Sequence, residues 1–225
     1  MLDRIRAAPI VRRVRDRGRR LANVVRFGKA APRPNERIWV EPAAVRFALD
    51  GLPVRSGYVV DRWPPADPVP FEDHVHVRFA LAHWRDGQSW EETGAYAYML
   101  EQIARRGRQD GCLDAADVRR RYERLDELFE TVRREGRLRT RSELDPAARD
   151  EDEGILVHIG PDGEPAIGDS GKHRMTIARL HGLGSVPARI GYVHRDAVRL
   201  LPGLRERPAA PAGASGSRAS PYGPP

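Results

Sequence analysis

Residues 154 to 194 constrain the fold more than any other part of the chain. Residues 155 to 159 are a short β-branched apolar run, and the turn sequence Pro-Asp-Gly-Glu follows at 161 to 164, so residues 165 to 168 should return as the second strand of a hairpin. The apolar period then changes to that of a helix, and residues 186 to 190 resume an extended pattern. This stretch therefore predicts strand, turn, strand, helix, strand.

The predicted helix begins beside a compact set of polar residues. Asp169 and Ser170 are typical N-caps, and Gly182 ends the helical pattern. A helix start presents unpaired backbone N–H groups and the positive end of the helix dipole. Here a glycine permits close approach of a ligand, and we expect an anion, most simply a phosphate, to be bound by Ser170, Gly171, Lys172, His173 and Arg174. In the alternative interpretation, Ser170 only caps the helix and the basic side chains are solvated.

Four segments occur in an order that is typical of one protein family. They are Gly171-x-His173-Arg174, Gly182-Leu183, Val186-Pro187-Ala188-Arg189-Ile190 and, more loosely, Ile38-Trp39-Val40-Glu41-Pro42. In these segments the chain resembles the ParB/sulfiredoxin superfamily, whose members share a compact domain with a G-x-x-R box that binds nucleotide phosphates. Activities of the family include CTP hydrolysis, ATP-dependent repair of sulfinic cysteine and phosphorylation of free serine. The resemblance implies an α/β (α+β) fold with a mixed sheet, and a nucleoside triphosphate, ATP or CTP, bound with Mg²⁺.

Departures from the family pattern narrow this expectation. Sulfiredoxins carry their catalytic cysteine at the position of Lys172, whereas the one cysteine here is Cys112, so sulfinic-acid repair is not expected. Partition proteins continue into a helix-turn-helix domain, but about 30 residues rich in Pro, Ala, Gly and Ser follow His194, so we expect no sequence-specific DNA binding. A classical P-loop is also absent, because Ala166 replaces its first glycine and His173 follows the lysine.

Two functional hypotheses follow. In the first, the chain is an enzyme that hydrolyses a nucleoside triphosphate or transfers its phosphoryl group, with the box on the phosphates and Asp169 assisting Mg²⁺ or the acceptor. Electrostatic positioning of this kind is most of what phosphoryl transfer requires. In the second, the box belongs to a non-catalytic regulatory module that senses a nucleotide or binds a polyanion or a partner. Metal-dependent turnover that requires Arg174 would favour the first hypothesis.

Positive charge is concentrated at the N-terminus. Residues 1 to 33 hold ten arginines and one lysine against two aspartates, a net charge of +9, and since the whole chain carries +7 the remainder carries −2. Residues 2 to 26 predict a helix with a loose apolar stripe, interrupted by Pro9 and Gly18. Such a helix binds an anionic membrane surface, attracts nucleic acid, or packs on the domain as a solvated extension, and the sequence leaves all three open.

Composition suggests three regions. We expect residues 1–35 to form the basic helix and a proline-containing linker, and residues 202–225 to form a disordered tail. Residues 36–201 lie between them and contain the segments that resemble the ParB/sulfiredoxin superfamily, so we expect them to form one domain of that type. A single cysteine and the lack of a run of about 20 apolar residues favour a cytoplasmic protein, peripheral to the membrane if the basic helix binds one.

Helices are also expected before the hairpin. Residues 114 to 135 carry a clean apolar stripe that should pack on the sheet, and Ser89 with Glu92 forms a capping box that should open another helix. His74 and His76 should be partly exposed on a helix, where positions two apart do not face each other, and with His83 they lack the spacing of a metal site.

Overall fold

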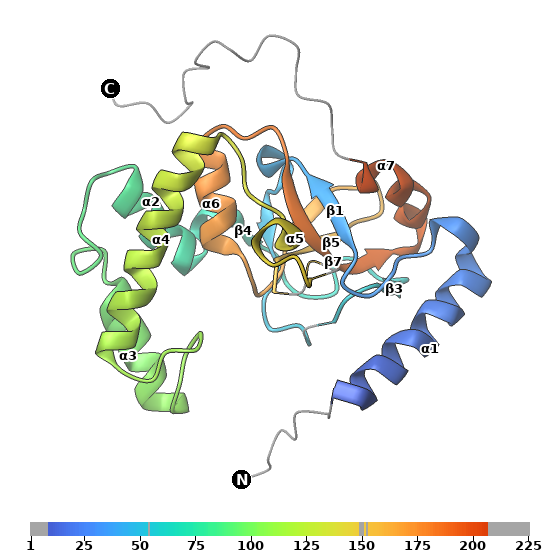
Figure 1. The fold of residues 1–225 in the computed structure, drawn as a ribbon, viewed down its shortest axis with the longest axis horizontal. Coiled ribbons are helices and arrows are strands. Elements are labelled where there is room, and N and C mark those ends of the chain that lie inside the picture. Colours follow the sequence, from blue (N-terminus) through green and yellow to red (C-terminus); the bar gives the residue numbers. More distant parts are fainter. Residues whose placement is uncertain (1–8, 54, 149–150, 152, 207–225) are drawn as a thin grey trace.

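The computed structural model describes residues 9–53, 55–148, 151 and 153–206, with only the backbone of residues 9–17 (Figure 1). In chain order its elements, in which η marks a 3₁₀ helix, are α1 (Pro9–Phe27), η1 (Gly28–Ala30), β1 (Arg37–Val40), η2 (Pro42–Ala44), β2 (Phe47–Ala48), β3 (Tyr58–Val60), β4 (Val69–Pro70), η3 (Phe71–Asp73), α2 (Val75–Trp84), α3 (Ala95–Arg106), α4 (Ala115–Glu135), α5 (Arg141–Leu144), β5 (Ile155–Ile159), β6 (Pro165–Ile167), α6 (Lys172–Leu180), β7 (Val186–His194), η4 (Arg195–Leu200) and α7 (Leu201–Arg205).

The strands form one mixed sheet in the order β1-β7-β5-β6-β2-β4, with β3 also paired to β7. The predicted hairpin of β5 and β6 is present and antiparallel, with Val157 opposite Ile167. Strand β7 returns parallel to β5, so the predicted order of strand, turn, strand, helix and strand is confirmed. The short strand β2 runs parallel to β6, which places the residues after β2 next to those that lead into α6.

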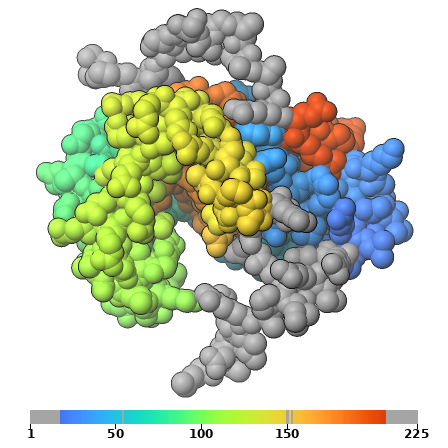
Figure 2. Space-filling view, in the orientation of Figure 1, coloured from blue at the N-terminus to red at the C-terminus, as the bar shows by residue number. Residues whose placement is uncertain are grey.

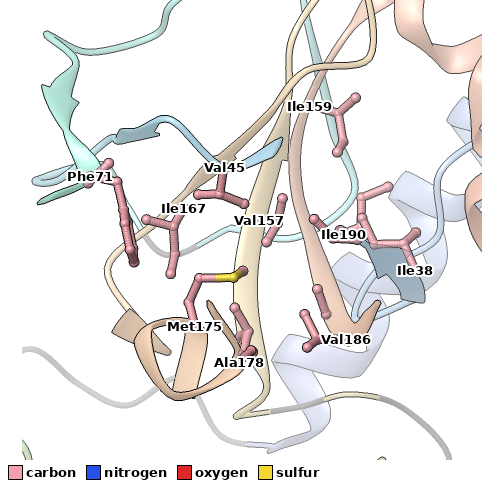
Figure 3. Close-up of a cluster of buried hydrophobic side chains, with 14 of the residues drawn as sticks. Ile38, Val45, Phe71, Val157, Ile159, Ile167, Met175, Ala178, Val186 and Ile190 are labelled. Carbon is pink, nitrogen blue, oxygen red and sulfur yellow. The ribbon is translucent and has the colours of Figure 1, made fainter. Parts of the chain in front are cut away.

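Helix α6 packs on the sheet through its apolar positions. Figure 3 shows Met175 and Ala178 of α6 beside Val157 and Ile167 of the hairpin, and all four side chains are buried in the main hydrophobic cluster. Full burial of an apolar side chain of this size stabilises a fold by roughly 1.5–3 kcal/mol. The start of α6 is therefore held firmly against the sheet.

Helices α3 and α4 form a second, smaller layer with α2 (Figure 1). The predicted stripe of α4 is confirmed, since Val118, Tyr122 and Val132 are buried. However, α4 packs on α3 and α6, not on the sheet as expected, because α6 already covers that face. The capping box at Ser89 and Glu92 has both of its hydrogen bonds, but residues 90–94 form turns and α3 begins only at Ala95, because Gly94 takes a left-handed conformation.

The first and last described helices, α1 and α7, differ from the prediction in detail. The N-terminal helix is described from Pro9 to Phe27 and is continuous through Gly18, so the predicted interruption at Gly18 is wrong, whereas the residues before Pro9 lie outside the described part of the chain. Residues 202–205, the start of the tail that was predicted to be disordered, are helical in α7, because Leu201 is fully buried and the Arg205 Nε–H donates to Glu36 Oε1 at 2.7 Å. The rest of the predicted tail, residues 207–225, lies outside the described residues. None of the described helices is long and apolar enough to cross a bilayer.

Candidate phosphate-binding site at the start of α6

The first turn of α6 is not capped by a side chain. Gly171 is the N-cap, with φ of 97°, whereas the Ser170 hydroxyl donates to the Gly154 carbonyl at 3.1 Å and Asp169 Oδ1 accepts from the Gly51 N–H at 3.1 Å. The predicted capping role of Asp169 and Ser170 is therefore wrong, because both side chains are engaged by neighbouring loops. Within the described part of the chain, the amide N–H groups of residues 172–174 consequently have no acceptor.

Gly171 has a structural reason to be glycine. A Cβ at this position would lie 2.7 Å from the Ile155 Cα, and the positive φ is itself unfavourable for other residues. The glycine thus allows α6 to start directly against β5, and this close packing accounts for it without the ligand approach that the sequence suggested.

Lys172 is buried and fixed in place. Its side chain is 5% exposed, and the Nζ donates to Asp50 Oδ1 at 2.6 Å and to the Gly168 carbonyl at 2.8 Å. The second Asp50 oxygen lies 2.7 Å from His74 Nε2. Because His74 Nδ1 accepts from the His76 N–H, the proton of a neutral His74 lies on Nε2 and is donated to Asp50. Burial tends to raise the pKa of Asp50, but the hydrogen bonds from His74 and Lys172 outweigh it and hold that pKa far below its usual value.

The pKa of Asp169 is shifted in the opposite direction, above its usual value. Partial desolvation, together with the negative charge of the neighbouring Asp50, raises the pKa of this exposed carboxyl. Two adjacent carboxyl groups whose pKa values are pushed apart are a common arrangement for acid–base chemistry, in which one stays ionised and the other exchanges protons. Asp169, the predicted catalytic residue, therefore has a suitable environment, and Asp50 is a partner that no local sequence pattern indicated.

Arg174 borders the same turn. Its Nη2 donates to the Glu153 carbonyl at 2.8 Å, and although burial lowers its pKa the guanidinium stays charged. A guanidinium has five N–H donors, so one carbonyl contact leaves most of its hydrogen-bonding capacity for an anion. Arg174 is therefore the residue of the predicted box that is best placed to bind a ligand.

His173 lies among aromatic rings. The side chain is buried, with ring centroids of neighbours at distances of 5.5 to 6.5 Å: His76, Trp84, Trp90 and Tyr122. Burial, followed by nearby positive groups, lowers its pKa well below 6.5, so the ring is neutral at neutral pH. In this position His173 packs α6 against the helical layer, which does not fit the predicted phosphate contact.

Several polar atoms in this seam between α2, α4 and α6 are buried without a hydrogen-bond partner in the described part of the chain: His76 Nδ1, Arg121 Nε, Tyr122 Oη and His173 Nε2. An unsatisfied buried donor or acceptor costs about 1–3 kcal/mol.

The rings of His74 and His76 are stacked, with their centroids 5.5 Å apart. The expectation that these two side chains would not face each other is therefore wrong, because His74 precedes the helix as its N-cap.

The surface is hollowed beside this region. Figure 2 shows a concavity between the lobe of α3 and α4 and the segment around α5, with orange atoms of the segment that contains β6 and α6 visible at its inner edge. A separate cavity of about 500 Å³ lies where the end of α1 meets η4, and none of the predicted site residues lines it. The described residues contain no group of three His, Cys, Asp or Glu side chains arranged to hold a metal ion.

No protein-family model, curated protein or solved structure matches the chain. The functional argument therefore depends on the geometry at the start of α6.

Proposed function

We propose that the chain is a nucleotide-binding protein of the ParB/sulfiredoxin type that hydrolyses a nucleoside triphosphate or transfers its terminal phosphoryl group. The observation that carries the proposal is the first turn of α6, where the amides of residues 172–174, which have no acceptor among the described residues, adjoin two cationic side chains and a pair of carboxyl groups. Free amides at a helix start, reinforced by the helix dipole, favour phosphate oxygens.

The two cationic residues have different roles in this proposal. Arg174 contributes new hydrogen bonds to a phosphate through its unused N–H groups, in the planar geometry that suits phosphate oxygens. Lys172 is held between Asp50 and Gly168, so it contributes mainly a fixed positive charge and one further N–H. Mg²⁺ typically binds substrate phosphates, and in this proposal the phosphates hold it, since Asp50 is paired with Lys172 and Asp169 is kept for proton transfer.

Asp169 is the proposed general base. It accepts the proton of a water or alcohol as that oxygen bonds to the terminal phosphorus, and the nucleoside diphosphate leaves. The raised pKa of Asp169 suits proton exchange, whereas Asp50 remains ionised and keeps Lys172 in position.

Calorimetric titration with ATP, CTP, GTP and ADP, with and without Mg²⁺, tests the proposal. The wild type should bind one of these nucleotides, and Arg174→Ala should weaken binding by roughly 10- to 100-fold, because a hydrogen bond to a charged group is worth about 1.5–3 kcal/mol. Arg179→Ala is the matched control, since this arginine lies in the last turn of the same helix and pairs with Glu72.

Phosphate release separates the two hypotheses. Asp169→Asn should retain nucleotide binding and lose about 10²- to 10⁴-fold in turnover, as expected for removal of a general base. If the folded wild type binds none of the nucleotides, the proposal is rejected. Binding without turnover would instead favour the nucleotide-sensing module.

A further inference from the structure

Helix α1 is attached to the domain through its polar face. The Asn23 amide is buried and donates to the Pro32 and Gly57 carbonyls at 2.9 and 3.0 Å. One turn earlier, the Arg19 guanidinium lies 3.4 Å from the centroid of the Tyr58 ring. These contacts confirm that α1 packs on the domain, and they fix which face of the helix is turned outward.

The outward face carries apolar side chains. Leu21, Val24 and Val25 are 67%, 45% and 81% exposed. Leu21 and Val25 each lie two positions from Asn23, which is about 160° around the helix axis from the docked face. A helix on the surface of a domain normally turns its apolar side chains toward the core, whereas these three side chains of α1 face away from it. Figure 1 shows α1 along the outside of the molecule, away from α3 and α4.

Positive charges flank the apolar residues. Arg20, Arg26 and Lys29 are exposed, and residues 1–33 carry a net charge of +9 against −2 for the rest of the chain. Nucleic acid would complement the charge but would gain nothing from the exposed apolar stripe. A second copy of α1 would cover the stripe but would bring two strongly positive segments together. An anionic lipid surface complements both features.

We propose that α1 binds an anionic membrane surface. The helix lies in the plane of the interface, with Leu21, Val24 and Val25 at the boundary of the acyl chains and the flanking cations on the lipid headgroups. The polar attachment through Asn23 then sets how the domain is presented to that surface. This role depends neither on nucleotide binding nor on turnover.

Co-sedimentation of the full chain with vesicles tests this proposal. Vesicles of phosphatidylcholine are compared with vesicles of equal parts phosphatidylcholine and phosphatidylglycerol. The wild type should bind only the anionic vesicles, and Leu21→Ser/Val25→Ser should weaken binding by about tenfold or more, from the lost burial of apolar surface. The matched control is Leu113→Ser/Leu144→Ser, which changes two leucines that are 62% and 61% exposed elsewhere on the chain. That control should bind like the wild type.

A charge variant tests the electrostatic contribution of the cations to membrane binding. Each cation removed in Arg20→Gln/Arg26→Gln/Lys29→Gln should weaken binding by about fivefold, since a cation near an anionic surface contributes about 1 kcal/mol. Circular dichroism confirms that each variant keeps its fold. The proposal is overturned if the wild type does not bind anionic vesicles, or if both serine pairs reduce binding equally. It is also overturned if the α1 serine pair instead abolishes a dimer in sedimentation equilibrium, or if duplex DNA binds and anionic vesicles do not.

Discussion

Removal of Asp50 should destabilise the fold through the lysine that it leaves behind. In Asp50→Ala, the Lys172 ammonium, whose side chain is 5% exposed in the wild type, would keep the Gly168 carbonyl as its remaining partner among the described residues. Breaking a fully buried ion pair by removing one partner costs about 3–5 kcal/mol. Since the Asp50 side chain is 39% exposed, solvent screens part of this cost, and we expect a loss of about 1–3 kcal/mol in the free energy of unfolding.

A double-mutant cycle with Lys172→Met isolates the pair from the other contacts of Asp50. Methionine keeps the unbranched shape and most of the length of the lysine side chain without its charge, and urea unfolding gives the free energy of each variant. Because His74 also donates to Asp50, the single variant includes that loss, whereas the coupling energy does not. We expect a coupling of about 1–2 kcal/mol at neutral pH.

The result that would refute this reasoning is a coupling close to zero with an unchanged denaturant slope. It would mean that Asp50 does not hold the Lys172 ammonium in the folded protein. The fixed positive charge beside the start of α6 would then be lost from the functional proposal as well. A large coupling that disappears in acid would support the assignment, since the lowered pKa of Asp50 stabilises the fold above its unfolded value of about 4 and this stabilisation is lost as the pH falls.

Two further predictions concern buried polar groups. Tyr122→Phe removes a buried hydroxyl without a partner in the described residues, so thermal unfolding should show unchanged stability or a gain of about 1 kcal/mol, and a clear loss would contradict this. His158 is neutral because burial lowers its pKa from 6.5 to about 4, so the unfolded chain takes up the proton first. The free energy of unfolding should therefore fall by up to about 3 kcal/mol as the pH drops from 6.5 to 4. In urea titrations, His158→Gln should make this decline shallower. An equally steep decline in the variant would contradict a neutral, buried His158.

Local patterns predicted the parts of the fold that local interactions determine. The hairpin of β5 and β6, helix α6 and strand β7 follow from apolar periodicity and turn residues that lie within one short stretch. The apolar stripe of α4 could also be predicted from the sequence, but the surface on which it packs could not. Periodicity shows that a helix has a buried face, whereas the choice between sheet and neighbouring helix depends on which element already occupies the sheet.

The site was less predictable because its members are far apart in the sequence. Asp50 and Lys172 are 122 positions apart, and the parallel pairing of β2 with β6 brings them together. Neither Asp50, in the loop after β2, nor His74, the N-cap of α2, lies in a sequence pattern that distinguishes it from an ordinary loop residue. The aromatic surroundings of His173 could not be predicted for the same reason, since only the tertiary fold places these rings around it.

The contacts already made by the box residues decide where a ligand would gain affinity. Lys172 is held by Asp50 and Gly168, so a phosphate that draws on the lysine must compete with a carboxylate at 2.6 Å. Arg174 makes one carbonyl contact, and the amides of its turn make none within the described residues, so they offer donors without such competition. Affinity for a phosphate should therefore depend more on Arg174 than on Lys172, whereas stability should depend more on Lys172. Opposite rankings in titration and unfolding would contradict this division of roles.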